Sequence, residues 1–195
     1  MTGKTHIAIG ISAALTISIG QPIENQVFLV LASAIGSLIP DLDHPRGKLN
    51  QKLLLVSSNF CRILFYISLG VVSIYLSHII DNNTLKLLGI ILILIGISSH
   101  RSFTHSIVGF LASASIVKVA TISYGLSSIY SGFVIGYGLH LIADFFNPKG
   151  IQLFYPLNMN VAFPITIKTN SSLEKMLFML LSVYSVWILF GYLNF

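Results

Sequence analysis

Long runs of apolar residues without a single charge divide this chain. Such runs cover residues 63–77, 106–117, 119–139 and 176–195. A helix that crosses the hydrocarbon core of a bilayer needs about 20 such residues, with a working range of about 17–25. The pattern predicts an all-α, polytopic membrane protein with about seven helical segments, at 6–20, 26–40, 61–80, 84–99, 104–123, 127–144 and 175–194.

The first, second and fourth of these segments are short for a full crossing. A helix of about 15 residues is only about 22 Å long, against a hydrocarbon core of about 30 Å. We therefore expect the first two segments to form a shallow or re-entrant hairpin around Gly20-Gln21-Pro22. The region of about 145–174 mixes polar and apolar residues with three prolines, which predicts a loop at the inner membrane face. We expect residues 1–195 to form one helical domain.

The composition excludes several classes of protein. Charged residues make up only 9% of the 195 residues, and hydrophobic residues make up 54%. Soluble domains carry about 25% charged residues, so an ordinary soluble enzyme and a disordered protein are both excluded. Cys61 is the one cysteine in the sequence, which excludes an internal disulfide and a cysteine-based zinc site.

The basic residues indicate how the segments are oriented. With seven crossings and a cytoplasmic N-terminus, nine of the 11 Lys and Arg residues fall at cytoplasmic ends, and only Lys86 and Lys118 fall at the opposite ends. The nine are Lys4, Arg46, Lys48, Lys52, Arg62, Arg101, Lys149, Lys168 and Lys175. The positive-inside rule therefore predicts a multi-pass protein in this orientation. Because topology accounts for the net charge of +5, the expected partner is the lipid bilayer and no nucleic acid is expected.

Most of the histidines and acids gather in four short stretches. They are His6, Ile39-Pro-Asp-Leu-Asp-His-Pro45, His100-Arg-Ser-Phe-Thr-His105, and the pair His140 and Asp144. In the seven-crossing arrangement all four lie at the same membrane face. Ionisable groups near a bilayer are costly and call for a reason. The eight potential ligands therefore favour a metal site over coincidence.

The spacing within the stretches indicates which groups share an ion. His140 and Asp144 lie one helical turn apart, so both face one side of a helix. Asp41 and Asp43 lie two residues apart in a proline-bounded loop, so they can point in different directions. The sequence leaves open which of the two binds the metal and which orients a histidine. Imidazole with carboxylate suits zinc, or manganese or iron, better than calcium. Taken singly, each stretch is also explained by a helix cap, a turn or a helix hydrogen bond.

Together these stretches resemble the motifs of the YdjM-like family of inner-membrane, metal-dependent hydrolases. The matching stretches, in the family's order, are His6, Gly36-Ser-Leu-Ile-Pro-Asp-Leu-Asp-His-Pro45, His100-Arg-Ser-Phe-Thr-His-Ser106 and Gly138-Leu-His-Leu-Ile-Ala-Asp144, followed by Asn147-Pro-Lys-Gly150 and Tyr155-Pro156. The family is similar to zinc-dependent phospholipase C and to single-strand nucleases, which are helical enzymes with clustered zinc ions. The resemblance implies that His140 and Asp144 match their His-x-x-x-acid pair, with His6 and Asp41 as earlier ligands. Those soluble enzymes also use their N-terminal amine and a tryptophan as ligands. We expect no counterpart here, because Trp187 lies in the last segment.

We therefore expect a membrane-bound hydrolase that acts on a phosphoester of a lipid or lipid-linked substrate at the cytoplasmic face of a bacterial inner membrane. A dinuclear centre of divalent metal, zinc foremost, is expected on His6, Asp41, His100, His105, His140 and Asp144, with His44 and Asp43 as further ligands or orienting groups. Asp43 is also the expected acceptor of a proton from water, and Arg101 and Arg46 are expected to hold phosphate oxygens. The alternative is a non-enzymatic divalent-cation transporter or metal-binding protein, whose site is expected near the bilayer midplane. In a purely structural bundle the same clusters would only cap helices.

Overall fold

Helices dominate the computed structural model, which describes residues 1–47, 49–54, 56–122 and 124–193. The α-helices are α1 Gly3–Ile17, α2 Ile23–Gly36, α3 Asn50–Leu53, α4 Asn59–Ile80, α5 Asn83–Ile97, α6 Ile107–Ile122, α7 Ser127–Phe145 and α8 Ser172–Leu193, and the short 3₁₀ helices are η1 Pro40–Asp43 and η2 Phe103–His105. Lys48 and the final residues of the predicted segments 104–123 and 175–194 lie outside the described residues. Within these residues the all-α prediction is confirmed.

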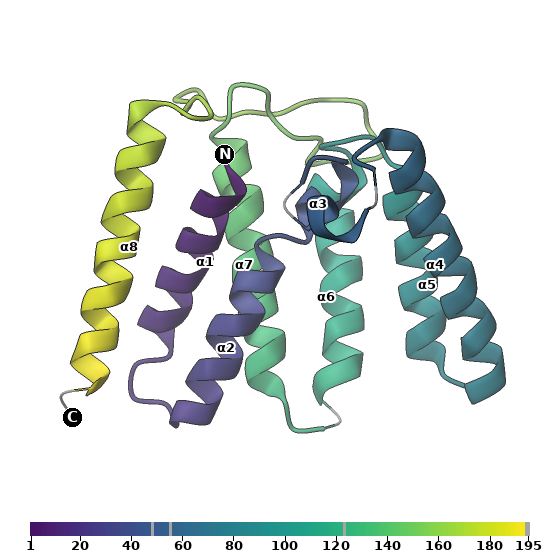
Figure 1. Cartoon of the computed structure of the whole chain (residues 1–195), viewed down its shortest axis with the longest axis horizontal. Coiled ribbons are helices and arrows are strands. Elements are labelled where there is room, and N and C mark those ends of the chain that lie inside the picture. The colour runs from purple at the N-terminus through teal and green to yellow at the C-terminus, as the bar shows by residue number, and fades with distance from the viewer. Residues whose placement is uncertain (48, 55, 123, 194–195) are drawn as a thin grey trace.

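The long helices stand side by side, and the chain passes alternately from one end of the bundle to the other (Figure 1). α2 packs against α7 and α1, α8 packs against α1, and α4 pairs with α5 as a helical hairpin. We call the end at which α1 and α8 begin and α7 ends the site end. The loop between α7 and α8 crosses this end of the bundle, as Figure 1 shows.

The number of membrane-spanning segments differs from the prediction. Within the described ranges, three helical stretches are long and apolar enough to cross a membrane: Ile23–Asp43, Asn59–Ile80 and Ser172–Tyr192. α5 and α6 are apolar but shorter. The expected number of about seven is therefore corrected to three, because several apolar runs give part of their length to turns and 3₁₀ helices. The predicted segment 104–123, for example, begins within η2, and its α-helix α6 starts only at Ile107.

Apolar side chains point outward along much of the bundle. Phe60 of α4 is 74% exposed and Trp187 of α8 is 70% exposed, and only 11% of the spanning window in α8 is buried. Water would not stabilise such a surface, whereas lipid chains would. The exposed faces thus fit a membrane protein.

Polar caps fix where several helices begin. Ser58 accepts a hydrogen bond from the backbone N–H of Cys61 at 3.1 Å, and Asn82 accepts from Thr84 and Leu85 at 2.9 and 3.2 Å. Ser106 accepts from the N–H of Gly109 at 3.0 Å at the start of α6. These side chains satisfy N–H groups that have no partner within their own helix.

Two glycines bring α7 into backbone contact with α2. A Cβ atom at Gly132 would overlap the carbonyl oxygen of Leu29, and one at Gly136 would overlap that of Ser33. Gly138 has open space by comparison, because its nearest neighbour would be the ring of Phe110 at 4.0 Å. The close α2–α7 crossing sets the position of the last two turns of α7, which carry His140 and Asp144.

We predict that Gly136→Ala destabilises the protein by about 1–3 kcal/mol, because an added methyl group forces α7 away from α2. Thermal unfolding of the purified protein in detergent measures this change. Gly138→Ala serves as the control and leaves the melting temperature close to that of wild type. Equal melting temperatures for Gly136→Ala and wild type would contradict the close crossing.

Candidate metal centre

The four stretches of histidines and acids meet at the site end of the bundle. His6 lies in the first turns of α1, Asp41 and Asp43 lie in η1, His105 ends η2, and His140 and Asp144 lie in the last turns of α7. The alternating direction of the helices produces this convergence, since α1 leaves the site end and α2, α5 and α7 return to it (Figure 1). Residues up to 138 positions apart in the sequence are thus neighbours.

One group of potential ligands combines α1 and α7. One ligand atom from each of His6, His140 and Asp144 lies within 4.8 Å of the others, and all three residues are buried. The rings of His6 and His140 stack with centroids 3.8 Å apart, and His6 Nε2 lies 3.3 Å from Asp144 Oδ1. The predicted pairing of His140 with Asp144 on one helix face is therefore present, and His6 completes the group.

A second group combines η1 with η2 and the turn that precedes η2. Asp41, His100 and His105 also place one ligand atom each within 4.8 Å of one another. His105 is fully buried, whereas the side chains of Asp41 and His100 are 20% and 35% exposed. This group consequently lies nearer the surface of the site end than the first.

The two groups adjoin each other and form one centre. His105 Nε2 lies 3.2 Å from His140 Nε2. Asp41 Oδ1 lies 3.9 Å from each of these nitrogens, and Asp144 Oδ2 lies 3.6 Å from His105 Nε2. Carboxylates from both groups thus face the same pair of imidazoles, an arrangement that suits two neighbouring cations.

Hydrogen bonds orient three of the imidazoles toward this centre. His140 Nδ1 donates to the carbonyl oxygen of Ser37 at 2.7 Å, and His100 Nδ1 and His105 Nδ1 donate to Asp43 at 2.7 and 3.2 Å. With the proton on Nδ1, each neutral ring presents the lone pair of Nε2. Metal-binding histidines are held in the same way by a carbonyl or carboxylate on the second ring nitrogen.

Three further observations fit a cation at this place. The Nε2 lone pairs of His105 and His140 face each other at 3.2 Å, which requires a cation or a shared proton between them. Among the described residues, neither ring nitrogen of the buried His6 has a hydrogen-bond partner, and such unsatisfied groups are costly. Burial opposes a charge on His105, but the carboxylate of Asp43 outweighs burial, so the pKa of His105 is raised. The surroundings of His105 therefore favour positive charge.

Asp43 holds the rings of His100 and His105 in orientation. Its side chain is fully buried, and besides the two histidines it accepts hydrogen bonds from the hydroxyl of Thr104 at 2.6 Å and the N–H of Arg101 at 2.9 Å. Of the roles that the sequence left open for Asp43, this geometry favours the orienting one. A carboxylate enclosed in this way is poorly placed to take a proton from water.

His44 lies beside the centre but outside both groups. Its Nδ1 accepts a hydrogen bond from the N–H of Arg46 at 3.1 Å, and its ring meets the ring of His100 edge-on at 4.5 Å. Burial and the neighbouring His100 lower the pKa of His44, so the ring is neutral with its proton on Nε2. Of the two roles expected for His44, further ligand or orienting group, this tautomer fits the second, because its Nε2 carries a proton and donates a hydrogen bond.

Other supporting residues were not found from the sequence. Asn50 donates from Nδ2 to the carbonyl oxygens of Leu42 and His44, at 2.9 and 2.7 Å, and accepts from the hydroxyl of Tyr66 at 2.6 Å. It thereby fixes the loop that carries Asp41 and Asp43. A lone asparagine in a polar stretch gives no sequence signal for this role.

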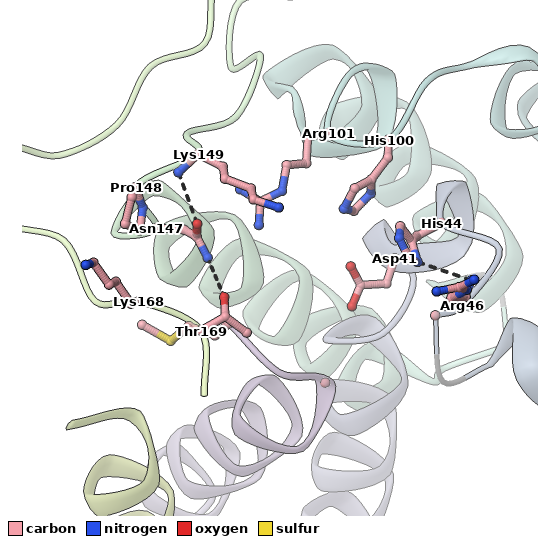
Figure 2. Close-up of a pocket in the computed structure, with 13 residues that line it drawn as sticks. Asp41, His44, Arg46, His100, Arg101, Asn147, Pro148, Lys149, Lys168 and Thr169 are labelled. Carbon is pink, nitrogen blue, oxygen red and sulfur yellow. Dashed lines mark hydrogen bonds between the residues drawn. The ribbon is translucent and has the colours of Figure 1, made fainter. Parts of the chain in front are cut away.

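A basic pocket opens onto the centre, with a volume of about 560 Å³. Ligand pockets commonly have volumes of about 300–1,000 Å³. Figure 2 shows Asp41, His44 and Arg46 on one side, Asn147, Lys149 and Lys168 on the other, and Arg101 and His100 between them. Asp41 is the one acid that lines it among the described residues, so the pocket suits an anion.

Arg101 and Met1 connect the pocket to Asp144. Arg101 Nη2 lies 3.3 Å from Asp144 Oδ2, while Nη1 donates to the carbonyl oxygen of Gly150 at 2.8 Å. The amino group of Met1 donates to Asp144 Oδ1 at 2.5 Å, and the buried Glu174 accepts from the N–H of Thr2. The Met1 amine thus borders the centre through its ion pair with Asp144. Trp187, as expected, lies far along α8.

Comparison with known proteins shows which family this chain belongs to. The uncharacterized protein YvsG of Bacillus subtilis (strain 168) is 28% identical over 193 residues, which cover 97% of each chain. The inner membrane protein YdjM of Escherichia coli (strain K12) and its counterpart in Shigella flexneri are each 25% identical, over 96% of this chain and 82% of theirs. No solved structure matches. The model of the YdjM inner membrane protein family matches residues 1–194, and the chain therefore belongs to that family.

Proposed function

We propose that this protein is a membrane-bound, metal-dependent hydrolase that cleaves a phosphoester of a lipid or lipid-linked substrate. The single observation that carries the proposal is the set of three oriented Nε2 atoms and two carboxylates next to a basic pocket, which two of these residues, Asp41 and His100, line. Ligands of this kind suit zinc, manganese or iron, and the two adjoining groups suit two ions.

We place the site at the cytoplasmic face of the inner membrane. The site end carries most of the basic residues, including Lys4 and Lys175 at the starts of α1 and α8, whereas Lys86 begins α5 at the opposite end. The positive-inside rule supports this orientation with a cytoplasmic N-terminus and several crossings.

Bound divalent cations would polarise a phosphoryl oxygen and lower the pKa of a nearby water molecule. His6, Asp41, His100, His105, His140 and Asp144 would hold them, and Asp43 would keep the rings of His100 and His105 in place. Arg101 and Arg46 would hold the phosphate oxygens and offset developing negative charge. We assign acceptance of the water's proton to Asp41 rather than Asp43, because Asp41 lines the pocket and Asp43 is enclosed.

The main alternative is a divalent-cation transporter or a metal-binding membrane protein without catalysis. A transport site is expected near the bilayer midplane and open in turn to both sides. The ionisable groups here lie at the ends of α1 and α7 and in the two 3₁₀ turns. This placement favours the hydrolase.

Removal of ligands tests for the metal centre. We expect the double variant His140→Ala, Asp144→Ala to lose most of the divalent metal that copurifies with, or is loaded onto, the wild-type protein. Elemental analysis by mass spectrometry measures the metal-to-protein ratio, and a chelator should lower the melting temperature of the wild type but not that of this double variant.

The double variant His78→Ala, Glu24→Ala is the matched control, because both of its residues are exposed and lie outside the centre. It should bind as much metal as the wild type. Equal metal contents in all three proteins would remove His140 and Asp144 from the site, and a chelator without effect would favour a purely structural bundle.

The orienting role of Asp43 gives a second test. We expect Asp43→Asn to weaken metal affinity by about 10–100-fold, because an amide cannot accept hydrogen bonds from His100 and His105 as a carboxylate does. Competition with a chromogenic chelator measures the affinity. Asp81→Asn, at the opposite end of the bundle, should leave it unchanged, and an unaltered affinity in Asp43→Asn would contradict the orienting role.

A substrate screen tests the hydrolase itself. Purified protein loaded with zinc, manganese or iron is incubated with phospholipids, lipid-linked phosphates and nucleotides, and products are identified by mass spectrometry. We expect hydrolysis of a lipid phosphoester by the wild type and background rates for Asp144→Asn. Metal binding without turnover of any of these would support the non-enzymatic alternative.

A further inference from the structure

A small apolar pocket lies between α1, α7 and α8 beside the metal centre. Its volume is about 270 Å³. Besides Met1, it is lined by apolar side chains of the three helices and of the loop between α7 and α8. These residues are Ile9, Leu139, Ile142, Ala143, Phe146, Ile167 and Leu177. We call it the chain pocket.

The chain pocket adjoins the basic pocket along two chain segments. Phe146 lines the chain pocket and the next residue, Asn147, lines the basic one. The same change occurs from Ile167 to Lys168, and Met1 lines both pockets. The two segments are joined where the polarity changes, by a bond from the N–H of Ile167 to the carbonyl oxygen of Phe146 at 2.8 Å and one from Asn147 Nδ2 to Thr169 Oγ1 at 2.9 Å.

The two adjoining pockets together match an amphiphile. On one side of the boundary Arg46, Arg101, Lys149 and Lys168 offer positive charge, and on the other side every lining residue except Met1 is an exclusively hydrocarbon side chain. A lipid with a phosphate headgroup has the same division, with anionic oxygens at one end and methylene groups at the other. Burial of those methylene groups is favourable at each carbon.

We propose that the chain pocket holds the hydrocarbon chain of a lipid phosphate whose headgroup lies in the basic pocket. This inference rests on the proposed function and names the lipid subsite that function requires. A helix of another protein or of a second copy does not fit, because one turn of helix occupies on the order of 400–600 Å³, from its 5.4 Å pitch and 10–12 Å diameter.

Photo-crosslinking tests the location of the chain without depending on turnover. The probe is phosphatidic acid with a diazirine in one acyl chain, added to the metal-loaded protein in detergent, and the labelled residues are mapped by peptide mass spectrometry. We expect labelling concentrated on Leu139, Ile142, Ile167 and Leu177. Diacylglycerol with the same diazirine chain is the matched probe without phosphate, and we expect it to label these residues at least about tenfold less. Equal labelling by both probes, or labelling spread over the outer faces of α4 and α8, would overturn the proposal.

Filling the pocket provides an independent measurement. We expect Leu177→Trp to reduce labelling by the phosphatidic acid probe by about tenfold, which is the loss expected when about two methylene groups are displaced. Met179→Trp is the control on the same helix, because Met179 is 64% exposed and lies outside the pocket. Undiminished labelling of the remaining pocket residues in Leu177→Trp would contradict the assignment.

Failure of this inference is distinguishable from failure of the proposed function. Phosphate-dependent labelling of the chain pocket without hydrolysis of any lipid would uphold the subsite and remove the hydrolase. Hydrolysis of a lipid phosphoester without preferential labelling of the chain pocket would uphold the hydrolase and remove the subsite.

Discussion

The buried carboxylate of Asp43 is the interaction on which the centre depends. It joins η1 to His100, Arg101, Thr104 and His105, and thereby ties the turn after α2 to the turn before α6. An enclosed carboxylate is stable only when its oxygens are fully hydrogen-bonded. The same bonds that make its burial tolerable fix the rings of His100 and His105, so folding and site geometry cannot be separated at this residue.

Close packing between α2 and α7 provides the other half of the site. Gly132 and Gly136 let the two backbones touch, and one turn further on His140 donates to the carbonyl oxygen of Ser37. The distance between these helices is therefore set by backbone contact rather than by flexible side chains. Many apolar side chains of this protein are exposed on its outer surface. The backbone contact explains how the polar groups at one end of the bundle are nevertheless held in fixed positions.

Polarity changes abruptly at that end. Asn147 and Lys168 face a basic pocket, while their neighbours Phe146 and Ile167 face an apolar one. The proposed lipid site requires such a boundary, because headgroups meet hydrocarbon chains at one depth of a bilayer. On the proposed function, a centre at this boundary would reach the phosphate of a lipid that stays in the bilayer, and the chain does belong to an inner membrane protein family.

The sequence by itself determined the helical class, the approximate helix limits and the stretches that supply His6, Asp41, His105, His140 and Asp144. Uncharged apolar runs and helical spacing are local properties, and alternating helix direction then places the stretches at one end. Tertiary structure decided how many helices are long enough to span, which acid faces the pocket and which orients the rings, and that His44 lies aside. It also decided the roles of Asn50, Thr104 and Met1. These outcomes depend on side-chain directions and on contacts between distant segments, for which a single sequence carries no periodic signal.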